Sequence, residues 1–290
     1  NAATVNTGTS FTYDITAPTI SGGVTITSAT GIQNNLLNAG DVVSVTATFS
    51  ESIIVDNTVG SPTLSLVVGS TNRTATYASG SGSTSLVFQY TIQAGETDSD
   101  GISIGANALT LNSSTISDPA GNNAILTHSA MSDNNSYKVD TTAPTVNSFT
   151  ISDSLLTVGE TATVDLVFSE AVFGFASAAD ITDPSGTLAA MTSSDNITWT
   201  GTFTPTANTE EASNTLSLAT SWTDLAGNGG PSQTTANYAI DTLLPTISSV
   251  TSGWGTFLNA AEDNSSGTVT VLTSGAENDQ TVTVALNGTN

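Results

Sequence analysis

The stretch Asp41-Val-Val-Ser-Val-Thr-Ala-Thr-Phe49 alternates apolar and small polar side chains along its whole length. Successive side chains of a β-strand point to opposite faces, so this period of two predicts a strand with one face in a core and the other in solvent. Similar runs occur on both sides of it, separated by Gly, Asn, Asp and Ser, which favour turns. These patterns predict an all-β chain, and no segment shows a convincing helical period.

The runs fall into two series of seven. The first comprises Val24–Thr27, Asp41–Phe49, Thr63–Val68, Arg73–Tyr77, Ser85–Ile92, Ala108–Ile116 and Ser136–Val139. The second comprises Val146–Ile151, Thr161–Phe168, Asp180–Thr182, Thr187–Met191, Ile197–Phe203, Thr215–Ser221 and Ala236–Ile240. Seven short strands in about 100 residues are typical of an immunoglobulin-like (Ig-like) β-sandwich. The sequence therefore predicts sandwiches arranged in series, as an elongated array.

Three short motifs recur in the same order, which indicates internal repeats. Asp14-Ile-Thr-Ala-Pro-Thr19 returns as Asp140-Thr-Thr-Ala-Pro-Thr145 and as Asp241-Thr-Leu-Leu-Pro-Thr246, Phe49-Ser-Glu51 returns as Phe168-Ser-Glu170, and Asp118-Pro-Ala-Gly-Asn122 returns as Asp224-Leu-Ala-Gly-Asn228. The motifs predict homologous modules at residues 14–139 and 140–240. Residues 1–13 are expected to be the last strand of a preceding module. Residues 241–290 are expected to begin a third, incomplete module, with strands such as Thr268–Leu272 and Thr281–Leu286.

The charge balance excludes several classes of partner. The 290 residues include 25 acidic and two basic residues, for a net charge of −23. Nucleic acids and anionic membrane surfaces select basic proteins, so cations are the expected charged partners. Cysteine is absent, which leaves no disulfide or thiolate site. We expect no transmembrane helix because no apolar run approaches 20 residues, and the first residues lack the pattern of a signal peptide.

The repeated motifs resemble those of bacterial Ig-like repeats in giant secreted adhesins, including adhesins of the RTX type. The linkers of Asp-x-Thr-Ala-Pro-Thr form, the Phe-Ser-Glu motif and the Asp-x-Ala-Gly-Asn motif carry the resemblance, which covers residues 14–243 well and 244–290 weakly. It implies a sandwich fold, an extracellular or cell-surface location, and commonly calcium at module junctions. Most such repeats are spacers, so it implies no particular ligand.

The acidic landmarks are expected to meet at the ends of each module. In a seven-strand sandwich, the loops after the second strand and before the last strand lie at the pole where the chain enters. We therefore expect Asp14, Glu51, Asp118 and Asn122 to converge in one module, and Asp140, Glu170, Asp224 and Asn228 in the next. The loops at the opposite poles contribute Glu96, Asp98 and Asp100, and Glu210 and Glu211, and Asp241 opens the third linker. The first junction is expected to gather seven of these side chains: Glu96, Asp98, Asp100, Asp140, Glu170, Asp224 and Asn228.

All these ligands are hard oxygens, and Ca²⁺ takes 6–8 of them. Zinc would require His or Cys, and His128 is the only one of these. We therefore predict Ca²⁺. The alternative is that Asp118–Asn122 and its counterpart are ordinary turns. The run Glu96-Thr-Asp-Ser-Asp-Gly101 resembles the start of an EF-hand loop, but position 12 would be Asn107 and no helices flank the run, so we reject an EF-hand. Two interpretations of the run remain: a calcium loop that connects two strands, or a solvated acidic turn.

Enzymatic activity is not expected. A nucleophilic triad would depend on His128, and carboxylates that recur in every module are poor candidates for a catalytic pair. Trp199 and Trp222 lie in strand patterns and are expected in or near a core, whereas Trp254 is either a core residue or a sugar-stacking residue. The sequence thus predicts a spacer of an extracellular adhesin-like protein, stiffened by Ca²⁺, whose partners are neighbouring modules or an unknown surface ligand. The alternatives are a filament or surface-layer subunit completed by strand exchange, and a ligand-binding module.

Overall fold

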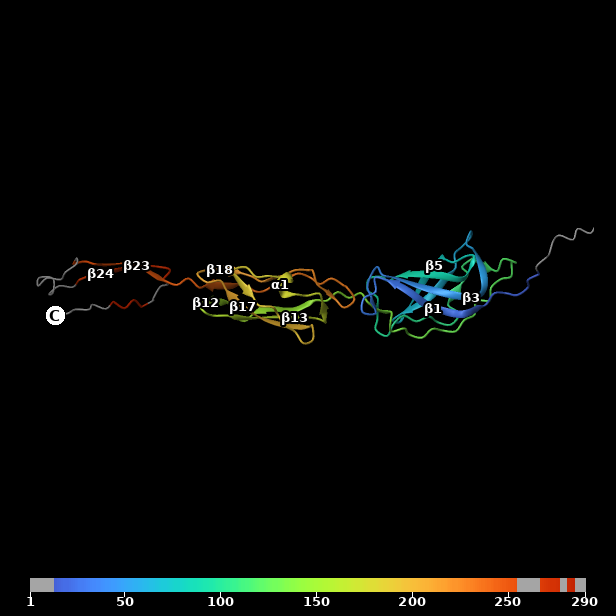
Figure 1. Ribbon diagram of the computed structural model, residues 1–290, viewed down its shortest axis with the longest axis horizontal. Helices are drawn as coiled ribbons and strands as arrows, with labels where there is room; N and C mark the ends of the chain where they lie inside the picture. The colour runs from blue at the N-terminus through green and yellow to red at the C-terminus, as the bar shows by residue number, and fades with distance from the viewer. Residues whose placement is uncertain (1–12, 255–266, 277–280, 285–290) are drawn as a thin grey trace, which may run out of the picture. The chain divides into compact units, whose positions relative to one another are not determined.

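The computed structural model describes residues 13–254, 267–276 and 281–284. Its contacts divide the chain into two compact units. The first unit extends to Pro144 and includes Ala171–Phe173 and Thr223–Gly230; the second comprises Thr145–Glu170, Gly174–Trp222 and the residues from Pro231 onwards. The regular secondary structure of each unit is almost all strand, which confirms the predicted all-β, Ig-like sandwich class (Figure 1). No helix in the described part of the chain is long and apolar enough to cross a bilayer.

The first unit is dominated by one antiparallel sheet. Its strand order is β1-β3-β6-β5-β4-β8, and β9 pairs with the far end of β3. The bounds are β1 Ile20–Thr30, β3 Val42–Asp56, β4 Thr63–Val68, β5 Thr71–Ser79, β6 Ser83–Thr91, β8 Leu109–Thr110 and β9 Thr115–Ser117. A smaller sheet of order β2-β10-β7 consists of β2 (Leu36–Leu37), β10 (Lys138–Asp140) and β7 (Thr97–Asp98), with β10 parallel to β2.

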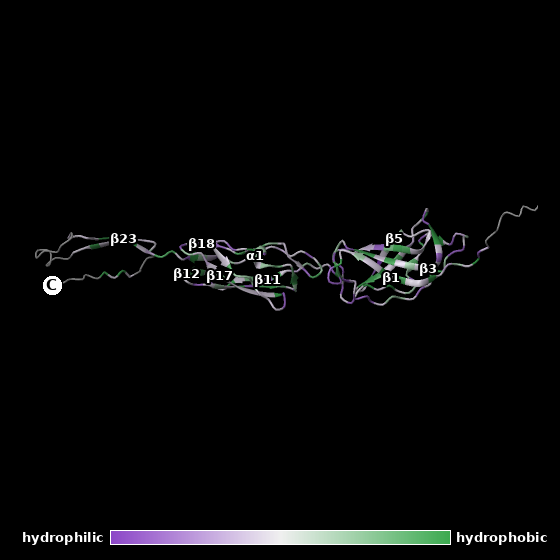
Figure 2. Cartoon of the chain, in the orientation of Figure 1, coloured by the Kyte–Doolittle hydropathy of each residue, from purple (hydrophilic) through white to green (hydrophobic). Residues whose placement is uncertain are grey.

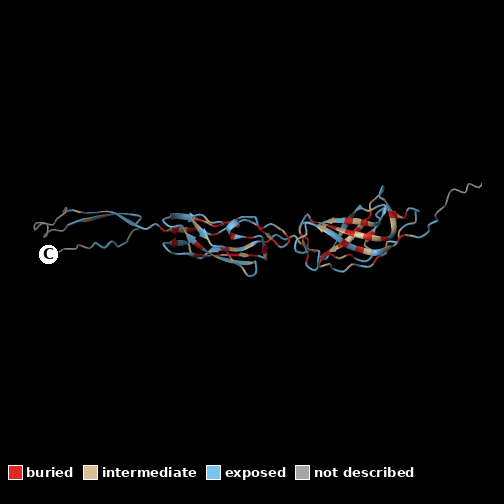
Figure 3. Ribbon diagram, viewed as in Figure 1, coloured by how far each residue is buried: buried red, intermediate tan, exposed pale blue. Residues whose placement is uncertain are grey.

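The alternation in β3 places one face of the large sheet in the core. Val43, Val45 and Ala47 are fully buried, while the Ser and Thr residues between them are partly exposed (Figure 3). The same alternation appears as apolar and polar bands along the strands in Figure 2. Burying each Val, Leu, Ile or Phe side chain contributes about 1.5–3 kcal/mol, so this face supplies most of the driving force for folding. Leu64 of β4, Leu86 of β6 and further side chains from six other strands complete the core.

The second unit contains a four-stranded sheet, two three-stranded sheets and one helical turn. The large sheet has the order β11-β13-β17-β16. The bounds are β11 Val146–Ile151, β12 Leu155–Thr157, β13 Ala162–Phe168, α1 Ser177–Asp180, β15 Ile181–Thr182, β16 Gly186–Leu188, β17 Thr198–Pro205, β18 Glu210–Asn214, β19 Ser217–Leu218, β21 Gln233–Thr234 and β22 Tyr238–Asp241. Its core is aromatic: the Phe168 ring packs on Trp222 with centroids 4.5 Å apart, and Phe203 packs edge-on against Tyr238.

Two local predictions were wrong for identifiable reasons. Ala108–Ile116 is not one strand, because Asn112 and Ser113 adopt positive φ and divide it into β8 and β9, which pair with different partners. Asp180 ends the four-residue helix α1 instead of beginning a strand. The Asp180 carboxylate accepts the Ala176 N–H at 2.7 Å and so closes a turn that is too short to show a helical period.

The third module is described only in part. Strands β23 (Thr246–Ser252) and β24 (Val269–Ser274) form an antiparallel pair, and β24 corresponds to the strand expected at Thr268–Leu272. Of the strand expected at Thr281–Leu286, residues 281–284 are not a strand and the rest lie outside the described residues. The predicted strand in residues 1–13 falls outside them as well, except for Tyr13, which is exposed and not in a strand. The predicted division into modules stays a prediction.

Candidate metal centre

Glu51 lies where strand β3 changes partner. The strand pairs with β6 without interruption as far as Thr48, the register then shifts so that Ile53 pairs with Ser83, and from Ile54 to Asp56 the strand pairs with β9. The shift leaves Glu51 in an irregular stretch at the end of the sheet. Because β9 ends at Ser117, opposite Ile54, this pairing also brings the following residue, Asp118, to the same end of the sheet.

Asp118 is held by its own loop. Its Oδ1 accepts the backbone N–H of Asn122 at 2.8 Å, and its Oδ2 accepts the side-chain amide of Asn122 at 2.7 Å. Gly121 has φ of +95°, which lets the loop close in a conformation that other residues rarely adopt. Burial tends to raise the pKa of Asp118, but the hydrogen bonds from Asn122, Gly121 and Ala120 outweigh it and hold the pKa below its usual value. Asp118 is therefore a buried, fixed carboxylate.

The linker residue Asp14 is tied to the same loop. The Asn122 side-chain amide donates to the Asp14 carbonyl at 3.1 Å, and the Asp14 carboxylate accepts the Thr16 N–H at 3.0 Å. Further along the linker, the Thr19 N–H donates to the Ser50 hydroxyl and the Ser50 N–H donates to the Thr19 carbonyl. These contacts fix the linker beside Glu51.

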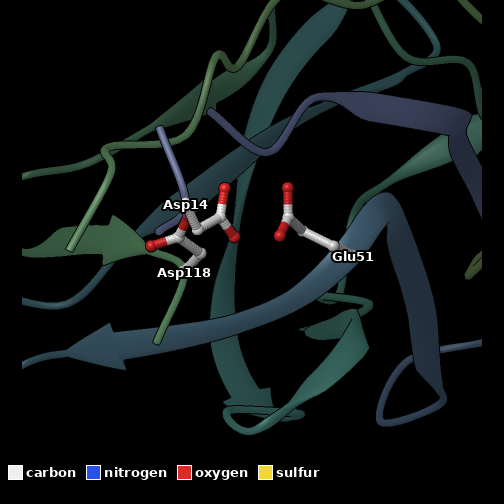
Figure 4. A group of neighbouring side chains, drawn as sticks. All are labelled: Asp14, Glu51 and Asp118. Carbon is white, nitrogen blue, oxygen red and sulfur yellow. The ribbon is translucent and has the colours of Figure 1, made fainter. Parts of the chain in front are cut away.

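Three carboxylates from distant parts of the sequence therefore meet at this end of the first unit. One oxygen each of Asp14, Glu51 and Asp118 lies within 4.8 Å of the other two. Figure 4 shows the Asp14 and Glu51 carboxylates turned towards each other. Asp14 and Glu51 also line an open pocket of about 450 Å³ with Ser52, Pro119 and Ala120. Desolvation, followed by repulsion from Asp14 and Asp118, raises the pKa of Glu51.

The donor chemistry of this group fits a hard cation. Three carboxylates in mutual contact repel one another, and a divalent ion would remove the repulsion that raises the Glu51 pKa. Oxygen ligands alone suit Ca²⁺, which tolerates irregular geometry, better than they suit zinc. The pocket leaves room for water to complete the 6–8 ligands that Ca²⁺ takes. The loop Asp118–Asn122 is thus a turn, as the alternative interpretation proposed, and also part of a carboxylate group.

The second copy of the motifs makes matching hydrogen bonds. Asp224 accepts the backbone N–H of Asn228 at 2.9 Å and its side-chain amide at 2.8 Å, and the same amide donates to the Asp140 carbonyl at 2.9 Å. Asp224 is buried in β20 (Thr223–Asp224), which pairs with β14 (Val172–Phe173). Ser169, immediately before Glu170, exchanges hydrogen bonds with Thr145 as Ser50 does with Thr19. Ser50 and Ser169 belong to the repeated Phe-Ser-Glu motif, but the motif alone did not indicate that they hold the linker.

The acidic loop of the first unit is used differently. Glu96 is buried, forms an ion pair with Arg73, and accepts hydrogen bonds from the Tyr90 hydroxyl and the Gln93 N–H. Asp98 is also buried, and its two oxygens accept the N–H groups of Gly69 and Gly101, each at 2.7 Å. Internal donors therefore occupy the carboxylates of Glu96 and Asp98.

Asp100 and Asp140 share a different surface. Together with Asp98 and Lys138 they line an open pocket of about 470 Å³, and Asp140 lies opposite Thr97 in the ladder between β10 and β7. The pKa of Asp98 is raised, first by desolvation and then by Asp100, against the lowering effect of its two backbone hydrogen bonds. Asp98 and Asp100 thus repel each other beside the only lysine of the chain.

The remaining predicted ligands lie in the second unit. Glu210 and Glu211 are exposed in β18, where Glu210 lies opposite Asp241 and Glu211 opposite Ile240. The Asp241 carboxylate accepts the Leu243 N–H at 3.2 Å, as Asp14 and Asp140 accept the N–H two residues later. These three linker aspartates therefore share one local turn geometry.

His128 and the tryptophans have structural positions. The His128 Nε2 accepts the Ala108 N–H at 2.9 Å and its Nδ1 lies 2.8 Å from the Ser129 carbonyl, so backbone groups engage both ring nitrogens. Trp222 is fully buried and Trp199 packs edge-on against Phe175, as their strand patterns predicted. Trp254 is partly buried against Gly267.

The comparisons with known proteins give one family match and two remote structural similarities. No curated protein sequence matches the chain. Among solved structures, the Escherichia coli adhesin FdeC is similar at 12% identity and a TM-score of 0.30, over 81% of this chain and 66% of that one. The Bacteroides ovatus protein SGBP-B, from a mixed-linkage glucan utilization locus and solved with a heptasaccharide, is similar at 13% identity and a TM-score of 0.19, over 79% of this chain and 50% of that one. The chain thus spans about two thirds and half of these two structures, a likeness too remote to carry function. A family model described as a bacterial Ig-like domain matches residues 140–240.

Proposed function

We propose that this chain is a non-enzymatic spacer of an extracellular, adhesin-like bacterial protein, and that Ca²⁺ stiffens it. The ion would bind where a linker aspartate meets the module that follows it: at Asp14, Glu51 and Asp118, and at the matching residues Asp140, Glu170 and Asp224. The convergence of Asp14, Glu51 and Asp118 carries the proposal. The bacterial Ig-like match at residues 140–240 supports the structural role.

The mechanism follows from the positions of the three carboxylates. Asp14 belongs to the linker, Glu51 to the irregular part of β3, and Asp118 to the loop after β9. An ion held by all three would fasten the linker to β3 and to the loop after β9, and so remove rotational freedom from the linker. Pro18 already restricts the same linker by fixing φ. Because the unfolded chain does not assemble the three ligands, the ion would also stabilise the folded state by mass action.

Thermal unfolding of the full chain in Ca²⁺ and in EDTA tests the proposal. With Ca²⁺ at about a hundred times its dissociation constant, we expect the melting temperature of the first unit to rise by roughly 5–10 °C. Glu51→Gln should remove most of this rise, because it deletes one ligand charge without shortening the side chain. Asp133→Asn, which changes an exposed aspartate outside the group, is the matched control and should retain the rise.

Small-angle scattering of the same samples tests the stiffening itself. We expect a more extended particle in Ca²⁺ than in EDTA for the wild type, and no such difference for Glu51→Gln. A wild type that responds to Ca²⁺ in neither measurement would contradict the proposal. The filament-subunit and ligand-binding interpretations would then be favoured.

A further inference from the structure

The residue after two of the linker aspartates makes a contact that the calcium proposal does not use. Thr141 follows Asp140, the last residue of β10, and is the first residue of the chain beyond that strand. Its hydroxyl donates to the Glu96 carbonyl at 2.8 Å and accepts the Gly95 N–H at 2.9 Å. One hydroxyl therefore satisfies a donor and an acceptor of the same turn. All three residues belong to the first unit.

The second unit contains the same contact at the equivalent position. Thr242 follows Asp241, the last residue of β22. Its hydroxyl donates to the Thr206 carbonyl at 2.7 Å and accepts the Thr209 N–H at 2.9 Å, while its backbone N–H donates to the Thr209 carbonyl at 2.8 Å. Thr242 is only 5% exposed. In each unit, the threonine that follows the strand (β10 or β22) is thus hydrogen-bonded to a turn of the same unit.

The turn that Thr141 contacts is itself held rigidly. The Glu96 carboxylate accepts the Gln93 N–H across the turn at 2.8 Å, accepts the Tyr90 hydroxyl, and forms an ion pair with Arg73. Arg73 lies in β5, in the middle of the large sheet. A path of hydrogen bonds and one ion pair therefore connects the sheet to the first residue of the linker.

The first linker shows that this contact is not an automatic property of the motif. The residue after Asp14 is Ile15, which has no hydroxyl and is 69% exposed. The aspartates at positions 14, 140 and 241 all cap the residue two positions later, but a threonine follows only Asp140 and Asp241. The aspartate turn and the threonine contact are therefore separate features.

We infer that Thr141 and Thr242 are positioning residues that fix the start of each linker to the sandwich it leaves, without a metal ion. The inference deepens the proposed spacer function and rests on it for its biological meaning. The contact uses hydroxyl and backbone groups only, so it should persist in EDTA. The start of a linker of this kind is then fixed by the threonine to the sandwich that precedes it.

Amide hydrogen exchange of the full chain, followed by NMR in EDTA and in Ca²⁺, tests the inference. Thr141→Val removes the hydroxyl at nearly constant volume and should speed exchange of the Gly95 amide by about tenfold, because that amide loses its acceptor. Thr141→Ser keeps the hydroxyl and should restore exchange to near the wild-type rate. Thr142→Val is the control, since Thr142 is exposed and its hydroxyl makes no hydrogen bond in the described structure.

Thr242→Val provides an independent measurement in the second unit. Exchange of the Thr209 amide should accelerate by a similar factor while that of Gly95 stays unchanged. Unchanged exchange of both reporter amides in the valine variants would overturn the inference, as would acceleration that occurs only in Ca²⁺. Failure of the calcium proposal is distinguishable, because it would abolish the rise in melting temperature with Ca²⁺ while Thr141→Val would still accelerate exchange of the Gly95 amide in both buffers.

Discussion

Two acidic regions of the first unit each contain three acidic residues but place their carboxylates in different environments. The loop from Glu96 to Asp100 brings three acids close together in sequence, and its two buried carboxylates are fully engaged by an arginine, a tyrosine and backbone N–H groups. The group of Asp14, Glu51 and Asp118 draws its acids from three distant segments, and one carboxylate oxygen of each lies within 4.8 Å of the other two. In the described structure, the ion pair between Arg73 and Glu96 serves the first region only.

The difference lies at Glu51: Asn122 supplies donors to both oxygens of Asp118, as Gly69 and Gly101 do for Asp98, whereas desolvation and then repulsion from Asp14 and Asp118 raise the pKa of Glu51. A buried carboxylate with several donors is stable without an ion. A carboxylate beside two others gains from a cation. The stability of the loop at Glu96 should therefore depend on its hydrogen-bond and ion-pair partners within the protein. The stability of the group at Glu51 should depend on the cations in the solution.

Removal of the arginine should have the largest effect. Arg73→Met keeps the aliphatic stem but leaves the Glu96 carboxylate, whose side chain is 3% exposed, without its counter-charge. We expect the free energy of unfolding to fall by about 3 kcal/mol, the lower end for a broken buried pair because Arg73 itself is 36% exposed. Urea denaturation measures the change. Arg73→Met with Glu96→Gln should recover most of the loss, and wild-type stability of the single variant would contradict the interpretation.

A smaller effect should separate the two regions by their response to calcium. Asp98→Asn places an amide where one oxygen accepts a backbone N–H, so we expect the free energy of unfolding to fall by about 1–2 kcal/mol. The rise in melting temperature with Ca²⁺ should nevertheless remain, whereas Glu51→Gln should abolish it. Calorimetry of both variants with and without Ca²⁺ checks this. Loss of the calcium response in Asp98→Asn would indicate that the ion binds at the loop from Glu96 to Asp100 and would contradict the proposed site.

The smallest effect concerns pH, and its sign should reverse with calcium. The pKa of Glu51 is raised above its ordinary value of 4.5, so in EDTA the folded state binds a proton at Glu51 more readily than the unfolded state does. Stability attributable to Glu51 should therefore increase as the pH falls from about 7 towards 4.5. In Ca²⁺ the same proton competes with the ion, and stability should decrease over this range. The difference between wild type and Glu51→Gln isolates the effect, and the same sign in both buffers would exclude a cation at Glu51.

The sequence predicts the long strands well because burial imposes their alternation. Thr63–Val68 and Val146–Ile151 were predicted to the residue, and β3 was found although it extends to Asp56. Two-residue strands such as β2 and β7 carry too few side chains to show a period, so they were missed. The division of Ala108–Ile116 depends on the positive φ of Asn112 and Ser113, which a repeating pattern of side chains does not reveal.

The candidate site was predictable only as far as topology determines it. The repeated motifs indicated that Asp14, Glu51 and Asp118 share one pole, and their carboxylates do meet. The fate of Glu96 was not predictable, because Arg73 and Tyr90 reach it from two neighbouring strands through the packing of the interior. The role of the Asn122 amide as a donor to Asp118 and to the Asp14 carbonyl depends on the loop conformation, which the residue type alone does not determine.

The placement of aromatic residues has a practical consequence for spectroscopy. All three tryptophans, at positions 199, 222 and 254, fall in the second unit, and the first unit has none. The first unit instead contains Tyr13, Tyr77, Tyr90 and Tyr137. Intrinsic tryptophan emission therefore follows the melting of the second unit alone, and near-ultraviolet tyrosine signals largely follow the first. One unlabelled sample can thus report on both halves of the chain separately in a single thermal scan.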